Sequence, residues 1–206
     1  MVHALANGVL AGYGIAIPVG AISVLIVETG VRHGFRRAAA AGAGAATADL
    51  IYAATAAIGG AAIASWITSV ETPFRWVSAL VLATIAVIGL VRAVRSGPAA
   101  DEPPVRTDRA GLVRTYRAFV GMTIINPLTV VYFTVFVIGS GIAAGFDAAE
   151  GAVFAVSAFV ASLSWQTLLA GVGGVAHHAL PGRFRLIASI VGNLIVLGLA
   201  VVVAVR

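Results

Sequence analysis

The chain of 206 residues contains no cysteine and no lysine, and only 10% of its residues are charged. The absence of cysteine excludes disulfide bonds, thiolate metal sites and thiol-redox chemistry. Soluble domains carry about 25% charged residues, so this chain has too few polar side chains to cover a water-exposed surface. With 60% hydrophobic residues and a mean hydropathy of +1.04, it is typical of a protein whose solvent is the lipid bilayer.

The basic residues do not indicate a nucleic-acid partner, although the formal charge is +5. All 13 are arginines, and they gather in particular loops rather than along one binding face. That distribution is typical of membrane topology and of contact with anionic lipids. No cleavable signal is expected, because no basic residue precedes the first hydrophobic segment, which is long enough to span a bilayer.

A transmembrane helix needs roughly 20 apolar residues. Six segments are candidates, the third of them short: Ala4–Val27, Ala38–Ala64, Trp76–Val91, Ala118–Ser140, Ala152–Val175 and Leu186–Val205. We therefore expect an all-α, polytopic membrane protein with six transmembrane helices in one transmembrane domain, residues 1–206. A first repeat covers about 4–91, a solvated cytoplasmic linker about 92–117, and a second repeat about 118–205.

The arginines predict the orientation of these segments. Eleven of them fall after the first, third and fifth segments: Arg32, Arg36, Arg37, Arg92, Arg95, Arg106, Arg109, Arg114, Arg117, Arg183 and Arg185. The opposite side has only Arg75 and Arg206. Because cytoplasmic loops carry an excess of basic residues, the arginine-rich side is predicted to be cytoplasmic and both termini extracytoplasmic.

The two halves of the chain share a spacing that indicates an internal repeat. Gly12, Pro18 and Gly30 correspond to Gly121, Pro127 and Gly139, each 109 residues later. Halves of three segments each are inserted with opposite orientations. The result is an inverted-topology repeat, as in many secondary transporters, whose binding sites lie near the midplane where broken helices meet.

Pro18 and Pro127 are expected to break the first and fourth helices. A proline cannot donate to the carbonyl four residues earlier, and in lipid the freed carbonyl needs a partner or a cavity. Such carbonyls are expected near Gly14, Ile15, Thr123 and Ile124. Unwound backbone of this kind can coordinate a cation or an ammonium group, and nearby helix N-termini favour a carboxylate. A plain kink without a ligand is the alternative.

Asp49 lies in the second segment, near mid-depth at a rise of about 1.5 Å per residue. An acid at the bilayer centre costs roughly 2.5–3.5 kcal/mol on insertion scales, and no basic residue within the segments can pair with it. We therefore expect Asp49 to carry a proton or to face a substrate amine, with Tyr52 on the same helix face. A structural acid, protonated or bonded to a neighbouring helix, is the alternative.

Two further polar positions lie within the segments. The amide of Asn126 could bind substrate or only satisfy the backbone freed by the proline that follows it. Ser162 and Gln166 are spaced i,i+4 and share a helix face, which helix–helix hydrogen bonding would also explain. The predicted substrate or proton pathway is therefore Asp49, Pro18, Asn126, Pro127, Tyr52 and Gln166.

Other polar residues have structural explanations. Glu28 follows the first segment and can pair with Arg32 one turn later, at the interface. His177 and His178 lie at a helix end, and a metal site needs more ligands than the sequence places near them. No metal site and no cofactor is expected.

At these residues the chain resembles the LysE-type translocator family of bacterial amino-acid exporters. The resemblance is carried by Ile17-Pro-Val-Gly-Ala-Ile-Ser-Val-Leu-Ile, by Ala48-Asp-Leu-Ile-Tyr52, and by Phe119 to Phe133 with its Asn-Pro. It implies export driven by the proton-motive force, in the bacterial cytoplasmic membrane, with Asp49, Pro18, Asn126 and Pro127 as the matching positions.

The chain departs from the family pattern at two places. Many members have Gly-Pro where this chain has Gly20-Ala21, and Asn-Pro-Lys where it has Asn126-Pro127-Leu128. A base beside the break could contact a substrate carboxylate, so its absence bears on which solute is carried. The wider superfamily includes metal-ion exporters and a membrane thiol reductase, and the lack of cysteine excludes the latter.

We therefore predict a secondary exporter of amino acids or related small solutes rather than an enzyme, with protons, the solute and membrane lipids as partners. A divalent-cation exporter and a non-transporting membrane scaffold are the alternatives. The 24 glycines and many alanines would also allow a homodimer, because small residues let membrane helices approach closely.

Overall fold

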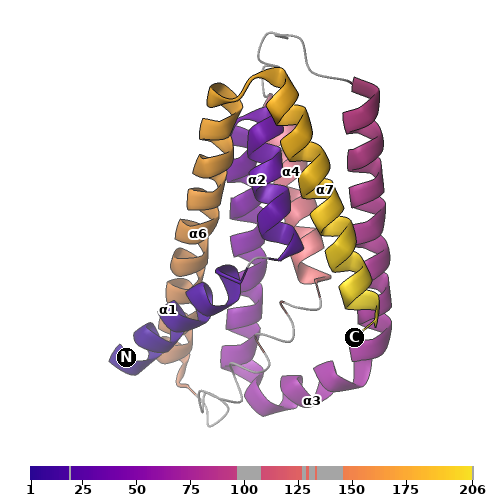
Figure 1. Ribbon diagram of the computed structural model, residues 1–206. Helices are drawn as coiled ribbons and strands as arrows, with labels where there is room; N and C mark the ends of the chain where they lie inside the picture. The colour runs from indigo at the N-terminus through magenta and orange to yellow at the C-terminus, as the bar shows by residue number, and fades with distance from the viewer. Residues whose placement is uncertain (19, 97–107, 127–128, 130–132, 134–145, 206) are drawn as a thin grey trace.

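The computed structural model describes residues 1–18, 20–96, 108–126, 129, 133 and 146–205. Their helices are α1 (Val2–Ala16), α2 (Ala21–His33), α3 (Phe35–Ser96), α4 (Arg109–Ile124), α6 (Ala148–Ala179) and α7 (Gly182–Val205) (Figure 1). This described part contains no strand. The all-α prediction is confirmed for it.

The second and third predicted segments lie in one helix, which corrects the expectation of two separate helices. Figure 1 shows α3 running down beside α2, across the lower end of the molecule and up again beside α7. The limits of the two apolar segments, with Arg75 between them, indicated a loop. Hydropathy reports the polarity of side chains, whereas the helix is maintained by local backbone hydrogen bonds.

Three described helical stretches are long and apolar enough to cross a membrane: Phe35–Ile58, Ala148–Ala179 and Gly182–Val202. The pair α1–α2, bent by 71°, makes a fourth if it counts as one broken span. Val156, Val160 and Val172 on α6 are exposed, as expected for side chains that face lipid. The protein is therefore a multi-pass membrane protein, while six spans remain a prediction.

The described helix ends near the arginines gather at one end of the bundle. In Figure 1 the end of α2, both ends of α3, the start of α4 and the turn from α6 to α7 lie at the top, whereas both termini lie toward the bottom. Arginines in these turns include Arg32, Arg36, Arg37, Arg95, Arg109, Arg183 and Arg185. The predicted arginine-rich side is thus one physical end, and its cytoplasmic location remains a prediction.

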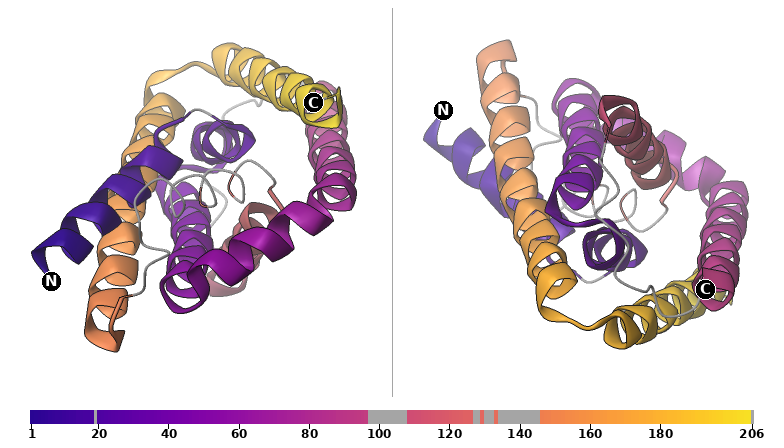
Figure 2. Two further views of the ribbon diagram at one scale, coloured as in Figure 1. Left: turned by 90° about the horizontal axis from the view of Figure 1, so that it is seen from below. Right: turned by 90° about the horizontal axis from the view of Figure 1, so that it is seen from above.

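Close helix contacts depend on residues without bulky side chains. In Figure 2 α2 is seen end-on in the centre, with α6, α7 and α3 around it. A Cβ atom added to Gly30 of α2 would lie 2.7 Å from the Cα atom of Gly173 of α6, too close for any real contact. Small residues thus allow the backbones of α2 and α6 to touch, in place of a hydrophobic driving force.

The predicted linker is helical at both of its described ends, because α3 continues to Ser96 and α4 begins at Arg109. The side chain of Asp108 caps α4 by accepting a hydrogen bond from Gly111 N at 2.9 Å. Residues 97–107 lie outside the described part. So do Pro127, Leu128 and Gly139, so the helix break at Pro127 and the inverted repeat remain predictions.

Candidate functional site

Asp49 lies in the descending part of α3 and is only 3% exposed. Its Oδ2 accepts a hydrogen bond of 2.6 Å from the hydroxyl of Ser162 on α6. Among the described residues no basic side chain forms an ion pair with it. Within the described part of the chain, Asp49 thus meets one hydroxyl donor, from a neighbouring helix, and a carboxylate has further lone pairs that can accept from another group.

Asp49 lines an internal cavity of about 60 Å³. Its described lining residues are Ile15, Ala16, Pro18, Gly20, Ile22, Ser23, Asp49, Thr123, Asn126, Thr129 and Gln166. Four of the six predicted pathway residues therefore meet here: Asp49, Pro18, Asn126 and Gln166. Pro127 lies outside the described residues, and Tyr52 is not among those that line the cavity.

The cavity lies where helices end. α1 ends at Ala16 and α2 begins at Ala21, so Pro18 lies in the connection between them. The last turn of α4, which ends at Ile124, reaches the cavity with Thr123. Helix ends bring backbone polar groups that lack intrahelical partners, and at bilayer depth such groups are tolerated only where protein or a cavity surrounds them.

Tyr52 forms a hydrogen bond at the end of α4 and is not among the described residues that line the cavity. Its hydroxyl donates a hydrogen bond to the carbonyl of Ile124, the last residue of α4. The carbonyl of Thr123 accepts a bond from Asn126 N at 3.2 Å. The two carbonyls expected to be freed near Pro127 therefore have partners within the protein, and Tyr52 supplies one of them.

Two buried polar atoms, on residues that line the cavity, lack a hydrogen-bond partner among the described residues. They are Oε1 of Gln166, which is 4% exposed, and Oγ1 of Thr123, which is 3% exposed. A buried polar group left unpaired costs about 1–3 kcal/mol. Both residues line the cavity, and a polar guest that fills a wider cavity can satisfy these two groups.

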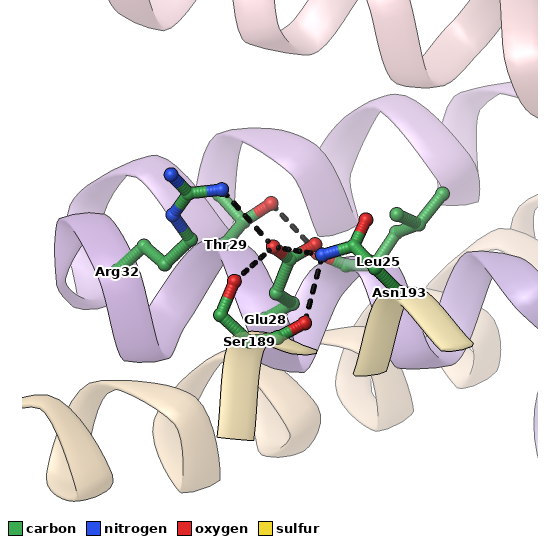
Figure 3. Close-up of polar contacts among 6 residues, drawn as sticks. All are labelled: Leu25, Glu28, Thr29, Arg32, Ser189 and Asn193. Carbon is green, nitrogen blue, oxygen red and sulfur yellow. Dashed lines mark hydrogen bonds and ion pairs between the residues drawn. The ribbon is translucent and has the colours of Figure 1, made fainter. Parts of the chain in front are cut away.

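Glu28 forms the predicted pair with Arg32, whose Nη1 lies 3.3 Å from Oε1. The same oxygen also accepts bonds from Ser189 Oγ at 2.9 Å and from Asn193 Nδ2 at 2.7 Å, both on α7 (Figure 3). The carboxylate is 10% exposed. The interfacial pair is thus one part of a polar clasp, Glu28, Arg32, Ser189 and Asn193, that joins α2 to α7.

Sequence reasoning missed several of these residues. Ser189 and Asn193 are spaced i,i+4 in an apolar segment, the same signal that drew attention to Ser162 and Gln166. Thr123 and Ser23 could have been found as hydroxyl residues within a few positions of the two prolines. At the arginine-rich end, His177 Nδ1 lies 2.8 Å from the carbonyl of Val31 in the last turn of α2.

A bundle of apolar helices around a buried polar cavity, where helices end, defines a class: polytopic membrane transport proteins of the helical type. Residues 14–206 match the family of LysE type translocators, and the chain belongs to this family. Family membership confirms the resemblance drawn from the sequence and indicates a transporter of amino acids or similar solutes rather than an enzyme. No curated protein and no solved structure shows significant similarity to the chain.

Proposed function

We propose that the protein exports amino acids or related small solutes across the bacterial cytoplasmic membrane, that proton entry drives the export, and that the Asp49 cavity binds both solute and proton. One observation carries the proposal. Asp49 is buried beside unpaired polar atoms, with one hydroxyl partner and no cation among the described residues.

A buried carboxylate without a cation is costly, because removing one member of a buried ion pair destabilises a protein by about 3–5 kcal/mol. Two guests relieve this cost at Asp49: a proton, or the ammonium group of a solute. They compete for the same oxygens, since a protonated carboxyl no longer attracts a cation. Competition at one site couples the two flows, because the solute leaves as a proton binds.

The test is efflux of radiolabelled amino acids from liposomes under an imposed pH gradient. Asp49→Asn keeps the shape of the side chain but neither ionises nor exchanges a proton, so we expect gradient-driven efflux to fall to the level of empty liposomes. Asp108→Asn is the matched control, because asparagine caps a helix as well as aspartate does, and it should transport normally.

Full gradient-driven efflux by Asp49→Asn would contradict the proposal. The alternatives have their own outcomes in the same liposomes. Flux of Cd²⁺ or Ni²⁺ would favour a cation exporter, whereas a folded protein that moves no probe would favour a membrane scaffold.

A further inference from the structure

The polar groups of the residues around the cavity fall into two sets on different helices. One set, on α3 and α6, consists of the Asp49 carboxylate and the Gln166 amide, whose Oε1 has no partner among the described residues. The other set, on α2 and α4, consists of the first turn of α2 and the hydroxyl of Thr123, which also has no partner among the described residues. The first set suits a cation, and the second set consists of groups that can donate hydrogen bonds.

The start of α2 supplies backbone donors. Gly20, Ile22 and Ser23, from the N-cap and first turn of α2, line the cavity. The structure shows no side chain of a described residue capping this end, and the first turn contains no acidic residue. The first N–H groups of a helix lack intrahelical partners, and the helix dipole makes this end positive. The turn therefore favours an anion.

Thr123 independently indicates that an anion binds in the cavity. The residue lines the cavity, and its Oγ1 is buried and has no partner within the described part of the chain. A hydroxyl can donate to an anion, and hydrogen bonds to charged acceptors are stronger than those to neutral ones. Thr123 comes from α4 and the N–H groups from α2, so two separate elements present donors to one cavity.

We propose that the first turn of α2 and Thr123 form a carboxylate subsite, and that the solute binds as a zwitterion with its ammonium group toward Asp49 and Gln166. This assignment rests on the proposed function. Apart from Asp49, the described lining carries no charged side chain, and Ile15, Ala16 and Ile22 complete an apolar wall. The preferred solute is an α-amino acid with an uncharged side chain.

The cavity is too small for an amino acid in this conformation. Its volume of about 60 Å³ holds a few water molecules, so the amino acid binds after the cavity widens. The connection around Pro18 separates α1 from α2 as two helices, which allows the donor turn of α2 to move relative to α1 without breaking a helix.

Binding to the purified full-length protein tests the subsite. The probes are L-leucine and L-threonine, their carboxamides, isoamylamine, L-lysine and L-glutamate. The carboxamides retain the ammonium group but lose the negative charge. We expect leucine or threonine to bind at least about tenfold more tightly than its carboxamide, isoamylamine, lysine or glutamate, since a hydrogen bond to a charged group contributes about 1.5–3 kcal/mol.

Thr123→Val removes the hydroxyl with little change of shape. It should weaken amino-acid binding about tenfold and leave carboxamide and amine binding unchanged. Thr115→Val on the same helix is the control, because Thr115 Oγ1 bonds to the carbonyl of Gly111 and does not line the cavity.

The outcomes separate the subsite from the proposed function. Equal binding of amino acids and carboxamides, or an equal loss for all probes in Thr123→Val, overturns the carboxylate subsite. If that binding still depends on Asp49, the proposed function stands. Tighter binding of lysine or glutamate overturns the preference for an uncharged side chain, and failure of every probe to bind the wild-type protein overturns both proposals.

Discussion

At the scale of single residues, Asp49 and Ser162 join α3 to α6 through one hydrogen bond inside the bundle. Ser162→Ala removes this donor but leaves the carboxylate to bind a proton or a solute. We expect slower efflux that still responds to the pH gradient, with a loss of about tenfold, as one charge-assisted hydrogen bond allows. Initial rates in liposomes check this, and Ser164→Ala is the control. A complete loss, as in Asp49→Asn, would show that Ser162 does more than hold Asp49.

Tyr52 is a second single residue with a testable role, in the stability of the fold rather than in transport. Tyr52→Phe keeps the ring stacked on Phe133, with centroids 5.4 Å apart, and removes the hydrogen bond to the Ile124 carbonyl. We expect the free energy of unfolding to fall by about 1–3 kcal/mol, so that the protein unfolds at a lower temperature. Its selectivity among amino acids should not change. Tyr116→Phe should matter less, because its partner Thr47 keeps a bond to Ala43. A change in selectivity without a change in stability would place Tyr52 in the binding site instead.

At the scale of elements, the contact between α2 and α6 requires two glycines to face each other. A Cβ atom on Gly173 would lie 2.5 Å from the carbonyl oxygen of Val27, whereas one on Gly171 would meet nothing within 4 Å. We therefore expect Gly173→Ala to lower thermal stability and Gly171→Ala to leave it unchanged or raise it, by up to about 1 kcal/mol. Thermal unfolding in detergent compares the two, and equal effects would contradict this packing.

The polar clasp joins α2 to α7, and α2 also carries the donor turn of the cavity. Its members share one carboxylate oxygen, so their mutations should not be additive. We expect Glu28→Ala and Asn193→Ala to show a coupling of about 0.5–3 kcal/mol in a double-mutant cycle. Glu28→Ala with Ser164→Ala, from a separate contact, should be additive, and additivity in both cycles would mean that the clasp does not couple these helices.

The sequence predicts some of this architecture and misses the rest for physical reasons. Composition and the length of the apolar segments are enough to predict an all-α membrane protein. The position of Asp49 in the middle of an apolar segment is enough to identify it as a candidate pathway residue. Four predicted pathway residues do line one cavity. The contacts of these residues come from helices that are distant in the sequence. Ser162 bonds to Asp49, Ser189 bonds to Glu28, and Thr123 lines the cavity. Helical periodicity gives the faces of each helix but not which faces meet.

At the scale of the whole molecule, the arginine-rich end is predicted to be cytoplasmic. The natural absence of cysteine makes single-cysteine labelling specific. Ala110 lies at the start of α4, at the arginine-rich end, and Ala148 lies at the start of α6, at the opposite end; both are exposed. In intact cells a membrane-impermeant maleimide should label Ala148→Cys and not Ala110→Cys. The reverse pattern would invert the predicted topology.

Proton movement evoked by amino acids tests the central claim most directly, namely that one buried carboxyl exchanges a solute for a proton. Liposomes carry the wild-type protein, Asp49→Asn or Asp108→Asn, a pH-sensitive dye inside and an outward amino-acid gradient. The account predicts that amino-acid efflux through the wild-type protein and Asp108→Asn acidifies the lumen, and that Asp49→Asn produces no such change. Acidification by Asp49→Asn at the wild-type rate, with the same amino acids, would contradict it.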